Sequence, residues 1–179
     1  MPKNIKHARE TILQKAKEIL LRDGLVGLNM RGVAQASGVA AGTLYNYFPS
    51  KDDLVFNILK KNWDEMLDRM EKKTPMALTA CEGLKIIFDM LREYSSDYSV
   101  LFNQMRATKS YDEFAKHRHS GVVEDISEQI HPLGIRFHFM FDPSVSAFLA
   151  EVLVTSSFYQ QGQFSFLEPC LKKITGEIA

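Results

Sequence analysis

Five side chains that can hydrogen bond to nucleic acid lie in the first third of the chain: Arg31, Tyr45, Asn46, Tyr47 and Lys51. The planar guanidinium group of arginine can bind O6 and N7 of guanine together, and an asparagine amide can pair with adenine. Phenol hydroxyls and ammonium groups can donate to phosphates, which positions a protein on DNA without reading its sequence. For Arg31 the alternative is a solvated surface arginine, and for Tyr45 a core aromatic. Asn46 could equally contact a phosphate or face solvent.

Two short helical patterns separated by a glycine would position these side chains. Asn29 is a good N-cap for the first pattern, because its side-chain oxygen can accept a backbone N–H of the first turn. Gly38 can adopt the positive φ that a tight turn between helices needs. Val39, Leu44 and Phe48 are spaced to pack the second helix onto the first. This order is typical of a helix-turn-helix unit, whose second helix lies in the major groove of DNA.

The run from Gly38 to Leu54 resembles the signature of the tetracycline-repressor (TetR) family of bacterial transcription regulators almost position by position. The resemblance spans roughly residues 5–55, and the remaining two thirds of the chain carry no motif that we can match. It implies an all-α fold with three parts. These are a helix-turn-helix DNA-binding domain at 1–50, a connecting helix at 51–73, and a helical effector-binding and dimerisation domain at 74–179.

Two residues depart from the family pattern. Ala40 stands where the family usually has Ser or Thr capping the recognition helix, a loss of about 1 kcal/mol on propensity. Gly32 stands where an acidic residue is common. Both departures concern the stiffness of the helix-turn-helix rather than its identity.

The resemblance also assigns roles to individual positions. Arg31 would reach a base edge or a phosphate, and the first residues of the second helix would lie over bases, where the Thr43 methyl group can touch a thymine methyl group. Tyr45, Tyr47 and Lys51 resemble the phosphate clamp of the family. The predicted DNA-binding residues are Arg31, Ala41, Gly42, Thr43, Tyr45, Asn46, Tyr47 and Lys51.

Charge is unevenly spread along the chain. Residues 1–51 contain eight Lys or Arg and three Asp or Glu, a net charge of +5, so the remainder carries −5 and the whole chain zero. A basic N-terminal part joined to an acidic remainder is typical of a protein whose N-terminal part contacts phosphate. A solvated helix face would have the same composition. No run is apolar enough to cross a membrane and no signal peptide is evident, which predicts a cytoplasmic protein. Cys81 and Cys170 are expected to be packed free thiols.

Hydrophobic spacing predicts about nine helices. A first helix at 4–23 would end at Gly24, and Ser50 with Asp53 forms a capping box that opens the helix at 51–73. A break at 72–76, containing Pro75, would separate the domains. The segment 131–143 alternates apolar and polar residues, so we expect an extended or irregular connection there. The remaining helices are expected at 77–94, 98–107, 112–130, 144–161 and 164–178.

Aromatic and methionine side chains recur on the expected helices of the C-terminal part. Such stripes form a core more often than a pocket, but the resemblance implies a small-molecule cavity between helices. We therefore expect a small hydrophobic or aromatic effector. The predicted ligand-binding residues are Phe88, Leu91, Phe102, Met105, Phe114 and Phe148.

Glu113, His117 and His119 lie close together in the sequence and raise the question of a metal site. The two histidines would lie on different faces of a regular helix, so they could not bind one ion together. The sequence has no Ser-His-Asp order, no glycine-rich phosphate loop and no cysteine pair with ligand spacing. We expect no metal, no cofactor and no enzyme activity.

The helix-turn-helix pattern and the family resemblance together imply a homodimeric transcription regulator, most simply a repressor released from operator DNA by its effector. Dimerisation is expected through the helices at 144–161 and 164–178, with Leu149 and Leu171 at the interface, because two heads need two half-sites related by a two-fold axis. The alternative is a DNA-binding regulator whose C-terminal body docks a protein partner and has no small-molecule effector.

Overall fold

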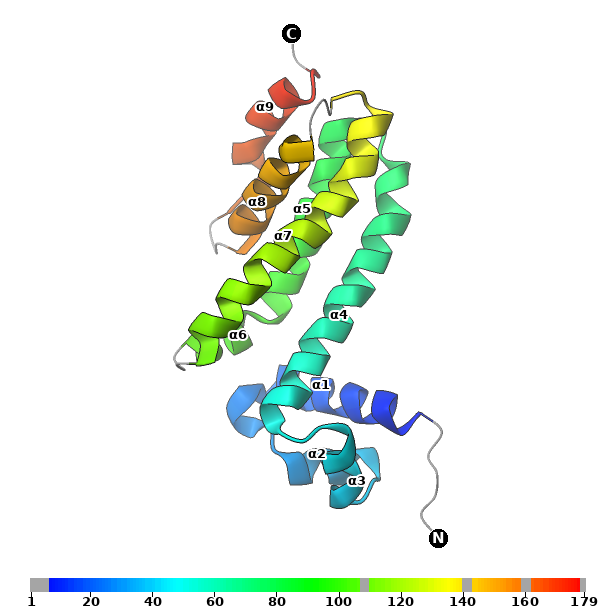
Figure 1. Cartoon of the computed structure of the whole chain (residues 1–179), viewed down its shortest axis with the longest axis vertical. Coiled ribbons are helices and arrows are strands. Elements are labelled where there is room, and N and C mark those ends of the chain that lie inside the picture. The colour runs from blue at the N-terminus through cyan, green and yellow to red at the C-terminus, as the bar shows by residue number, and fades with distance from the viewer. Residues whose placement is uncertain (1–6, 107–109, 140–142, 159–161, 178–179) are drawn as a thin grey trace. The chain divides into compact units, whose positions relative to one another are not determined.

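The computed structural model describes residues 7–106, 110–139, 143–158 and 162–177 of the chain. These residues form nine α-helices and one 3₁₀ turn and include no strand, so the all-α expectation is confirmed (Figure 1). The elements are α1 (Ala8–Gly27), α2 (Met30–Ser37), α3 (Ala41–Tyr47), α4 (Lys51–Lys73), η1 (Thr74–Met76), α5 (Ala80–Asp97), α6 (Ser99–Arg106), α7 (Ser110–Arg136), α8 (Pro143–Phe158) and α9 (Phe164–Ile174).

Backbone contacts divide the chain into two compact units. The N-terminal unit comprises Met1–Asp64 together with Val100–Gln104, and the C-terminal unit comprises Glu65–Ser99 and Met105–Ala179. The division falls inside α4, between Asp64 and Glu65, and not at the proline near 75. The functional domain boundaries at 50 and 73 therefore stay a prediction.

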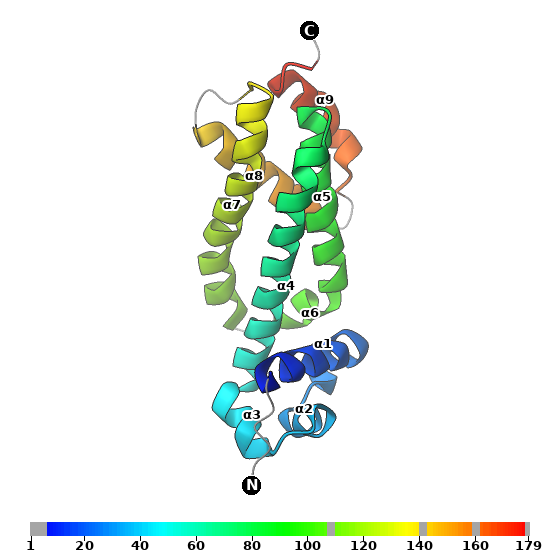
Figure 2. The same cartoon turned by 90° about the vertical axis from the view of Figure 1, so that its right-hand side faces the viewer.

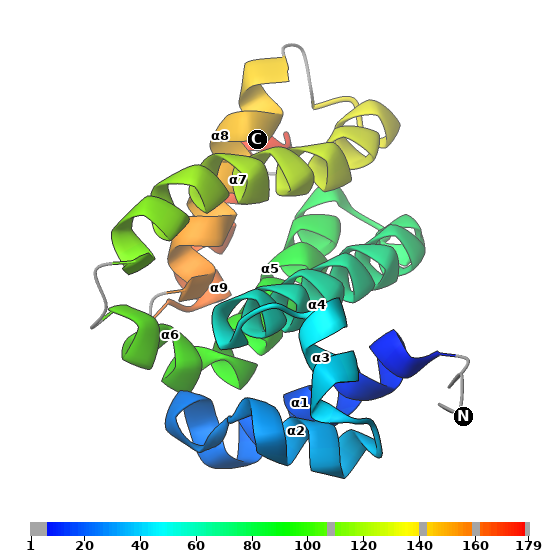
Figure 3. The same cartoon turned by 60° about the horizontal axis from the view of Figure 1, so that its bottom comes forward.

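The N-terminal unit is built on α1, α2, α3 and the first turns of α4, and Figure 3 shows α1, α2 and α3 grouped together. α1 packs on α2, and α2 on α3. Apolar side chains at three- and four-residue steps supply the core, as the amphipathic patterns predict. Its buried members include Ile12, Ala16, Leu20, Val33, Leu44, Phe48, Leu54 and Ile58.

α1 contains a break at Gly24, where φ is 68° and ψ is −173°. This is left-handed φ, which glycine adopts without the steric cost that a Cβ brings. The regular part of the helix therefore ends at Gly24, as the sequence predicts, and a last turn up to Gly27 follows. The N–H of Leu28 then donates to the carbonyl of Gly24 at 3.2 Å.

The C-terminal unit is a bundle in which α5 packs against α7, α8 and α9, and α7 runs beside α8 (Figure 2). The rings of Phe88 on α5 and Phe164 on α9 lie 5.5 Å apart. A Cβ at Gly83 would stand 2.7 Å from the side chain of Leu133, so α5 and α7 approach closely there. Fully buried residues of this core include Leu84, Ile87, Leu91, Ile126, Ile130, Leu149 and Leu153.

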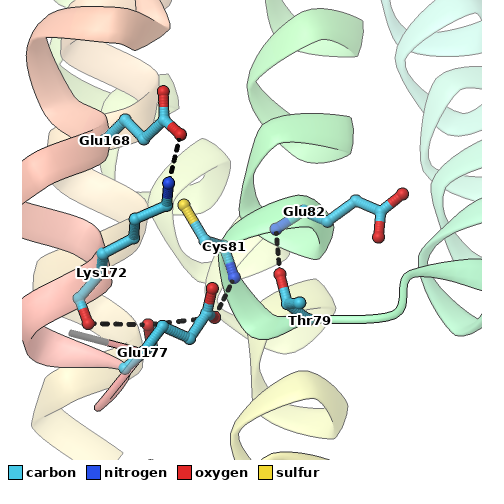
Figure 4. A network of polar contacts seen from close by, with 7 residues as sticks. Thr79, Cys81, Glu82, Glu168, Lys172 and Glu177 are labelled. Atoms are coloured by element: carbon cyan, nitrogen blue, oxygen red, sulfur yellow. Dashed lines mark hydrogen bonds and ion pairs between the residues drawn. The ribbon is translucent and has the colours of Figure 1, made fainter.

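The N-terminus of α5 is capped from two places in the C-terminal unit (Figure 4). Thr79 Oγ1 accepts the N–H of Glu82 at 3.1 Å, and Glu177 Oε1 accepts the N–H of Cys81 at 2.7 Å. A carboxylate at this end of a helix is favourable because unpaired N–H groups point toward it. Burial, together with Glu177 nearby, raises the pKa of the Cys81 thiol. Cys81 is thus a packed free thiol, whereas Cys170 is free but exposed, contrary to expectation.

The extended connection expected at 131–143 is wrong over its first half. α7 continues through Pro132 to Arg136, and a turn follows at Phe137 and His138. A proline inside a helix costs roughly 3 kcal/mol, because it removes an N–H and crowds the preceding turn. Burial of Leu133 against α5 offsets that cost, which local pattern could not show. Residues 140–142 lie outside the described part of the chain.

Candidate nucleic-acid interface

α2 begins and ends at the residues that the sequence indicates. The N–H of Gly32 donates to Asn29 Oδ1 at 2.8 Å, which satisfies a first-turn donor. At the other end Gly38 has φ 66°, and the N–H of Val39 reaches back to the carbonyl of Ala34 at 3.1 Å. This closure by a left-handed glycine fixes the angle at which the chain turns into α3.

α3 is anchored on one side and open on the other. Leu44 and Phe48 have no exposed surface, so their packing sets the rotation of the helix about its axis. The rest of the helix is open to solvent: Ala41, Gly42, Tyr45, Asn46 and Tyr47 are exposed, and Thr43 is partly exposed. No side chain caps its start at Ala40, as that residue type predicts.

The two tyrosines are not core residues. Tyr45 is 48% exposed and Tyr47 is 45% exposed, which removes the core alternative for Tyr45. About half of each residue's surface is thus open to solvent. Arg31 is also exposed, in the first turn of α2. Both α2 and α3 therefore carry exposed side chains that can donate hydrogen bonds to a polyanion.

Lys51 is placed differently from the other predicted contacts. Its ammonium group donates to the backbone carbonyl of Leu25, and the side chain is partly buried at the start of α4. The capping box beside it forms as expected, with Ser50 Oγ accepting the N–H of Asp53 at 3.0 Å. Lys51 thus holds the end of α1 to the start of α4, and only its remaining N–H donors could contact a phosphate.

Two other basic residues of the N-terminal unit also make internal contacts. Arg9 donates to Asn57 Oδ1 at 2.6 Å, and its guanidinium carbon lies 5.5 Å from the centre of the Phe48 ring. Lys17 donates to Asn62 Oδ1. These contacts tie α1 to α4 across 48 and 45 positions of sequence, so no local pattern could reveal them. Part of the positive charge of this unit therefore has a structural role.

The predicted ligand-binding residues belong to both units of the chain. Phe88 and Leu91 are buried in the C-terminal unit, and Met105 belongs to the same unit, whereas Phe102 belongs to the N-terminal unit. Phe148 is 58% exposed on α8. The side chain of Phe114 lies outside the described residues. The ligand-binding role of these six residues stays a prediction.

The question of a metal site can be asked only of the described residues. Among the described residues there is no group of three His, Cys, Asp or Glu side chains that could hold an ion. The side chains of Glu113, His117 and His119 are not among those described. In the same part of the chain, no helix is long and apolar enough to cross a membrane.

Comparison with known proteins finds one family model. Residues 12–58 match the model for bacterial regulatory proteins of the tetR family. A fatty acid metabolism regulator protein of Bacillus subtilis (strain 168) is 30% identical over 76 residues, which cover 42% of this chain and 39% of that protein. An HTH-type transcriptional regulator of Staphylococcus aureus (strain MRSA252) is 23% identical over 107 residues, or 60% and 58%. The matched region thus spans less than two thirds of the length of each of these relatives.

Solved structures share the fold over almost the whole chain. A transcriptional regulator from Cytophaga hutchinsonii has a TM-score of 0.69 and 22% identity, covering 96% of both chains. The transcriptional regulator FadR from Bacillus subtilis, in complex with stearoyl-CoA, has a TM-score of 0.61 and 19% identity. It covers 96% of this chain and 100% of that one. At this identity the likeness shows the fold alone.

Proposed function

The chain belongs to the tetR family of bacterial regulatory proteins, and on that premise we propose that this transcription regulator is a homodimeric repressor whose operator binding is weakened by an apolar effector. The observation that carries the proposal is the open face of α3. A helix held by two fully buried side chains presents Tyr45, Asn46 and Tyr47 to solvent. Such a helix can enter a major groove without rearranging its core.

The residues divide into two roles on DNA. Tyr45 and Tyr47 would donate to phosphates and set the register, whereas Arg31, Thr43 and Asn46 would meet base edges. Ala41 and Gly42 are small and exposed at the start of α3, so the helix can approach the bases closely. For Lys51, whose ammonium group donates to the Leu25 carbonyl, the proposed role is to hold α1 to α4, with a phosphate contact as the alternative.

Dimerisation is proposed through the outer faces of α8 and α9. Leu149 and Leu171, which the sequence places at the interface, are instead 0% and 2% exposed in the core of the unit. The outward apolar residues are Phe148 on α8 and Phe166 and Ile174 on α9, with exposures of 58%, 75% and 37%. Apolar residues exposed on these two helices favour a self-complementary interface between two copies, which would also supply the two-fold symmetry of an operator.

The effector is proposed to carry a long apolar chain. The helices of the C-terminal unit are lined with buried apolar side chains, including Phe88 and Leu91. A solved FadR with the same fold binds stearoyl-CoA, and a curated relative is a fatty acid metabolism regulator. An acyl thioester is therefore the first compound to test, with free coenzyme A as the control that lacks the apolar chain.

Selection from a random duplex library tests the DNA-binding proposal. The wild-type chain should enrich a pseudo-palindromic sequence, hereafter the selected duplex, and should bind it more tightly than a scrambled duplex at every salt concentration. Stearoyl-CoA should then raise the melting temperature and weaken that binding by about 1–3 kcal/mol of coupling. The selected duplex must weaken stearoyl-CoA binding by the same factor. Failure to enrich any sequence would refute the proposal.

One observation favours the alternative function, a body that docks a protein partner. Met76, Leu78 and Ile135 are 75%, 80% and 62% exposed, and a 2.7 Å bond from Arg136 Nη1 to the Pro75 carbonyl holds their segments together. An exposed apolar cluster of this kind can mark a protein interface. Sequence-specific DNA binding that does not respond to any acyl thioester or free fatty acid would favour this alternative.

A further inference from the structure

Gln104 belongs to the N-terminal unit although it lies in the middle of the chain. The segment Val100–Gln104 of α6 clusters with Met1–Asp64, while its neighbours in sequence belong to the other unit. Gln104 Oε1 accepts the backbone N–H of Leu25 at 2.8 Å, across 79 positions of sequence. A side chain from far along the chain thus completes the junction between α1 and α2.

The break at Gly24 explains why this junction needs outside partners. In a regular helix the N–H of Leu25 would donate to the carbonyl four residues earlier, but the left-handed φ at Gly24 turns the backbone away. A backbone N–H that is partly shielded from water destabilises the fold when it has no acceptor, and the Leu25 N–H is partly buried. Gln104 accepts that N–H, and the Lys51 ammonium group donates to the carbonyl of the same residue. We call these two side chains the Leu25 clasp.

The clasp is tightly fitted. A Cβ at Gly24 would lie 3.2 Å from Gln104 Nε2 and 3.3 Å from its Oε1, so the amide group rests directly on the glycine. α2 begins at Met30, five positions after Leu25, and its cap at Asn29 lies between them. The direction in which the chain leaves Leu25 therefore helps to place α2, and through the Gly38 turn it helps to place α3.

Resting on the proposed DNA binding, we propose that Gln104 is a positioning residue for the DNA-binding face. It touches no base or phosphate in this proposal. It acts through the Leu25 N–H, holding the Gly24 break in the one geometry that presents Arg31 and the open face of α3 together. Loss of the acceptor should therefore reduce binding to the selected duplex more than binding to a scrambled duplex, since the scrambled duplex tolerates a misplaced reading face.

Matched substitutions in the full chain test this role. Gln104→Met keeps the shape of the side chain and removes the acceptor, and Gln104→Glu keeps an acceptor. Asn103→Ala changes an exposed neighbour on the same helix and is the control. Affinity for the selected and scrambled duplexes is measured for each, together with hydrogen exchange of the Leu25 amide. If Gln104→Met does not fold, Gln104→Ala, which leaves room for water at that N–H, replaces it.

We expect Gln104→Met to lower the ratio of selected to scrambled affinity by about threefold to tenfold and to speed exchange at Leu25, because a net hydrogen bond is worth roughly 0.5–1.5 kcal/mol. Gln104→Glu should keep the affinity ratio and the exchange rate near their wild-type values, and Asn103→Ala should change neither. Faster exchange at Leu25 with an unchanged ratio would overturn the positioning role. A wild-type chain that selects no duplex would instead refute the proposed function, so the two failures are distinguishable.

Discussion

Each unit of the molecule has a helix that is anchored by large buried side chains and open on its outer side. In the N-terminal unit Leu44 and Phe48 anchor α3, and in the C-terminal unit Phe164 and Leu171 anchor α9. The outer sides differ in chemistry. α3 presents phenol and amide groups, whereas α9 presents Phe166, Cys170 and Ile174, spaced four residues apart along one stripe. Polar donors suit a hydrated polyanion, and an apolar stripe suits a second copy of the same surface.

The difference also explains why the sequence predicts the buried side of α3 but not the buried side of α9. The turn, caps and anchors of α3 lie within a few residues of one another, so they form a local signature. The inner and outer faces of α9 are both apolar, and periodicity alone does not say which face the protomer buries. The following substitutions test the comparison.

The largest effect is expected at the outer face of α9. Phe166→Asp places a charge in the proposed interface, and burying an unpaired carboxylate costs several kcal/mol. The dimer should dissociate, and affinity for the selected duplex should fall by a hundredfold or more because two linked heads become independent. Light scattering and duplex titration check this. Ser165→Asp, on an exposed neighbouring position, should leave the dimer intact, and an unchanged mass for Phe166→Asp would rule out this interface.

The anchors should matter for stability and the open face for binding. Leu44→Ala removes a fully buried side chain and should cost about 2–5 kcal/mol of unfolding free energy. Asn46→Ala, on the exposed side of the same helix, should leave stability within about 0.5 kcal/mol. Denaturant unfolding of both variants measures the contrast. Similar losses of stability would show that α3 is not divided into an anchoring and a reading side.

Arg31→Ala tests whether Arg31 contacts a base edge or a phosphate. If Arg31 binds a guanine edge, the variant should lose about 1–3 kcal/mol per half-site on the selected duplex and little on a scrambled one. Gln35→Ala, exposed one turn later on α2, is the matched control. Equal losses on both duplexes would make Arg31 a phosphate contact and leave sequence reading to Thr43, Asn46 and groove shape.

Lys51→Ala tests whether the ammonium group acts inside the protein. Because it donates to the Leu25 carbonyl, we expect a loss of roughly 0.5–1.5 kcal/mol in unfolding free energy and an unchanged salt dependence of DNA binding. A phosphate clamp would instead reduce the salt slope by about one for each phosphate that is no longer neutralised. Lys60→Ala, which removes an exposed pair with Asp64, should change stability by less. Titrations at several salt concentrations decide between the two roles.

The smallest effect concerns the two thiols. Burial raises the pKa of Cys81, which lowers its thiolate fraction, and its exposed surface is only 4%. Cys170 is exposed in the protomer but lies on the stripe proposed to form the dimer. A thiol reagent should therefore label Cys170 slowly in the wild-type dimer and rapidly in Phe166→Asp, while Cys81 stays slow in both. Rapid labelling of wild-type Cys170 would contradict its burial between copies.

The positions of α2, α3 and the start of α4 could be predicted because each depends on neighbours in sequence. Asn29 caps its own helix, Gly38 supplies its own left-handed φ, and Ser50 accepts an N–H three residues on. The family resemblance rests on the same residues, which is why the match to known regulators falls there. Local hydrogen bonds and backbone preferences decide these elements, and both can be read from the order of residues.

The tertiary structure decided what depends on distant partners. Alternating residues after His131 suggested an extended connection, yet packing of Leu133 against α5 keeps the helix through Pro132. Leu149 and Leu171 were expected to face a second copy, but the helices are rotated so that they fill the core of their own unit. In both cases the outcome depends on which helix lies opposite, because that helix determines how much apolar surface each side of its neighbour can bury.

The contrast is sharpest at Leu25. The sequence by itself determined that the chain breaks at Gly24, because glycine tolerates the φ that ends a helix there. Only the fold decided what occupies the break, since the partners are Lys51 and Gln104, 26 and 79 positions away. A backbone group that loses its helical partner must find another, and the identity of that partner is set by the packing of the whole unit.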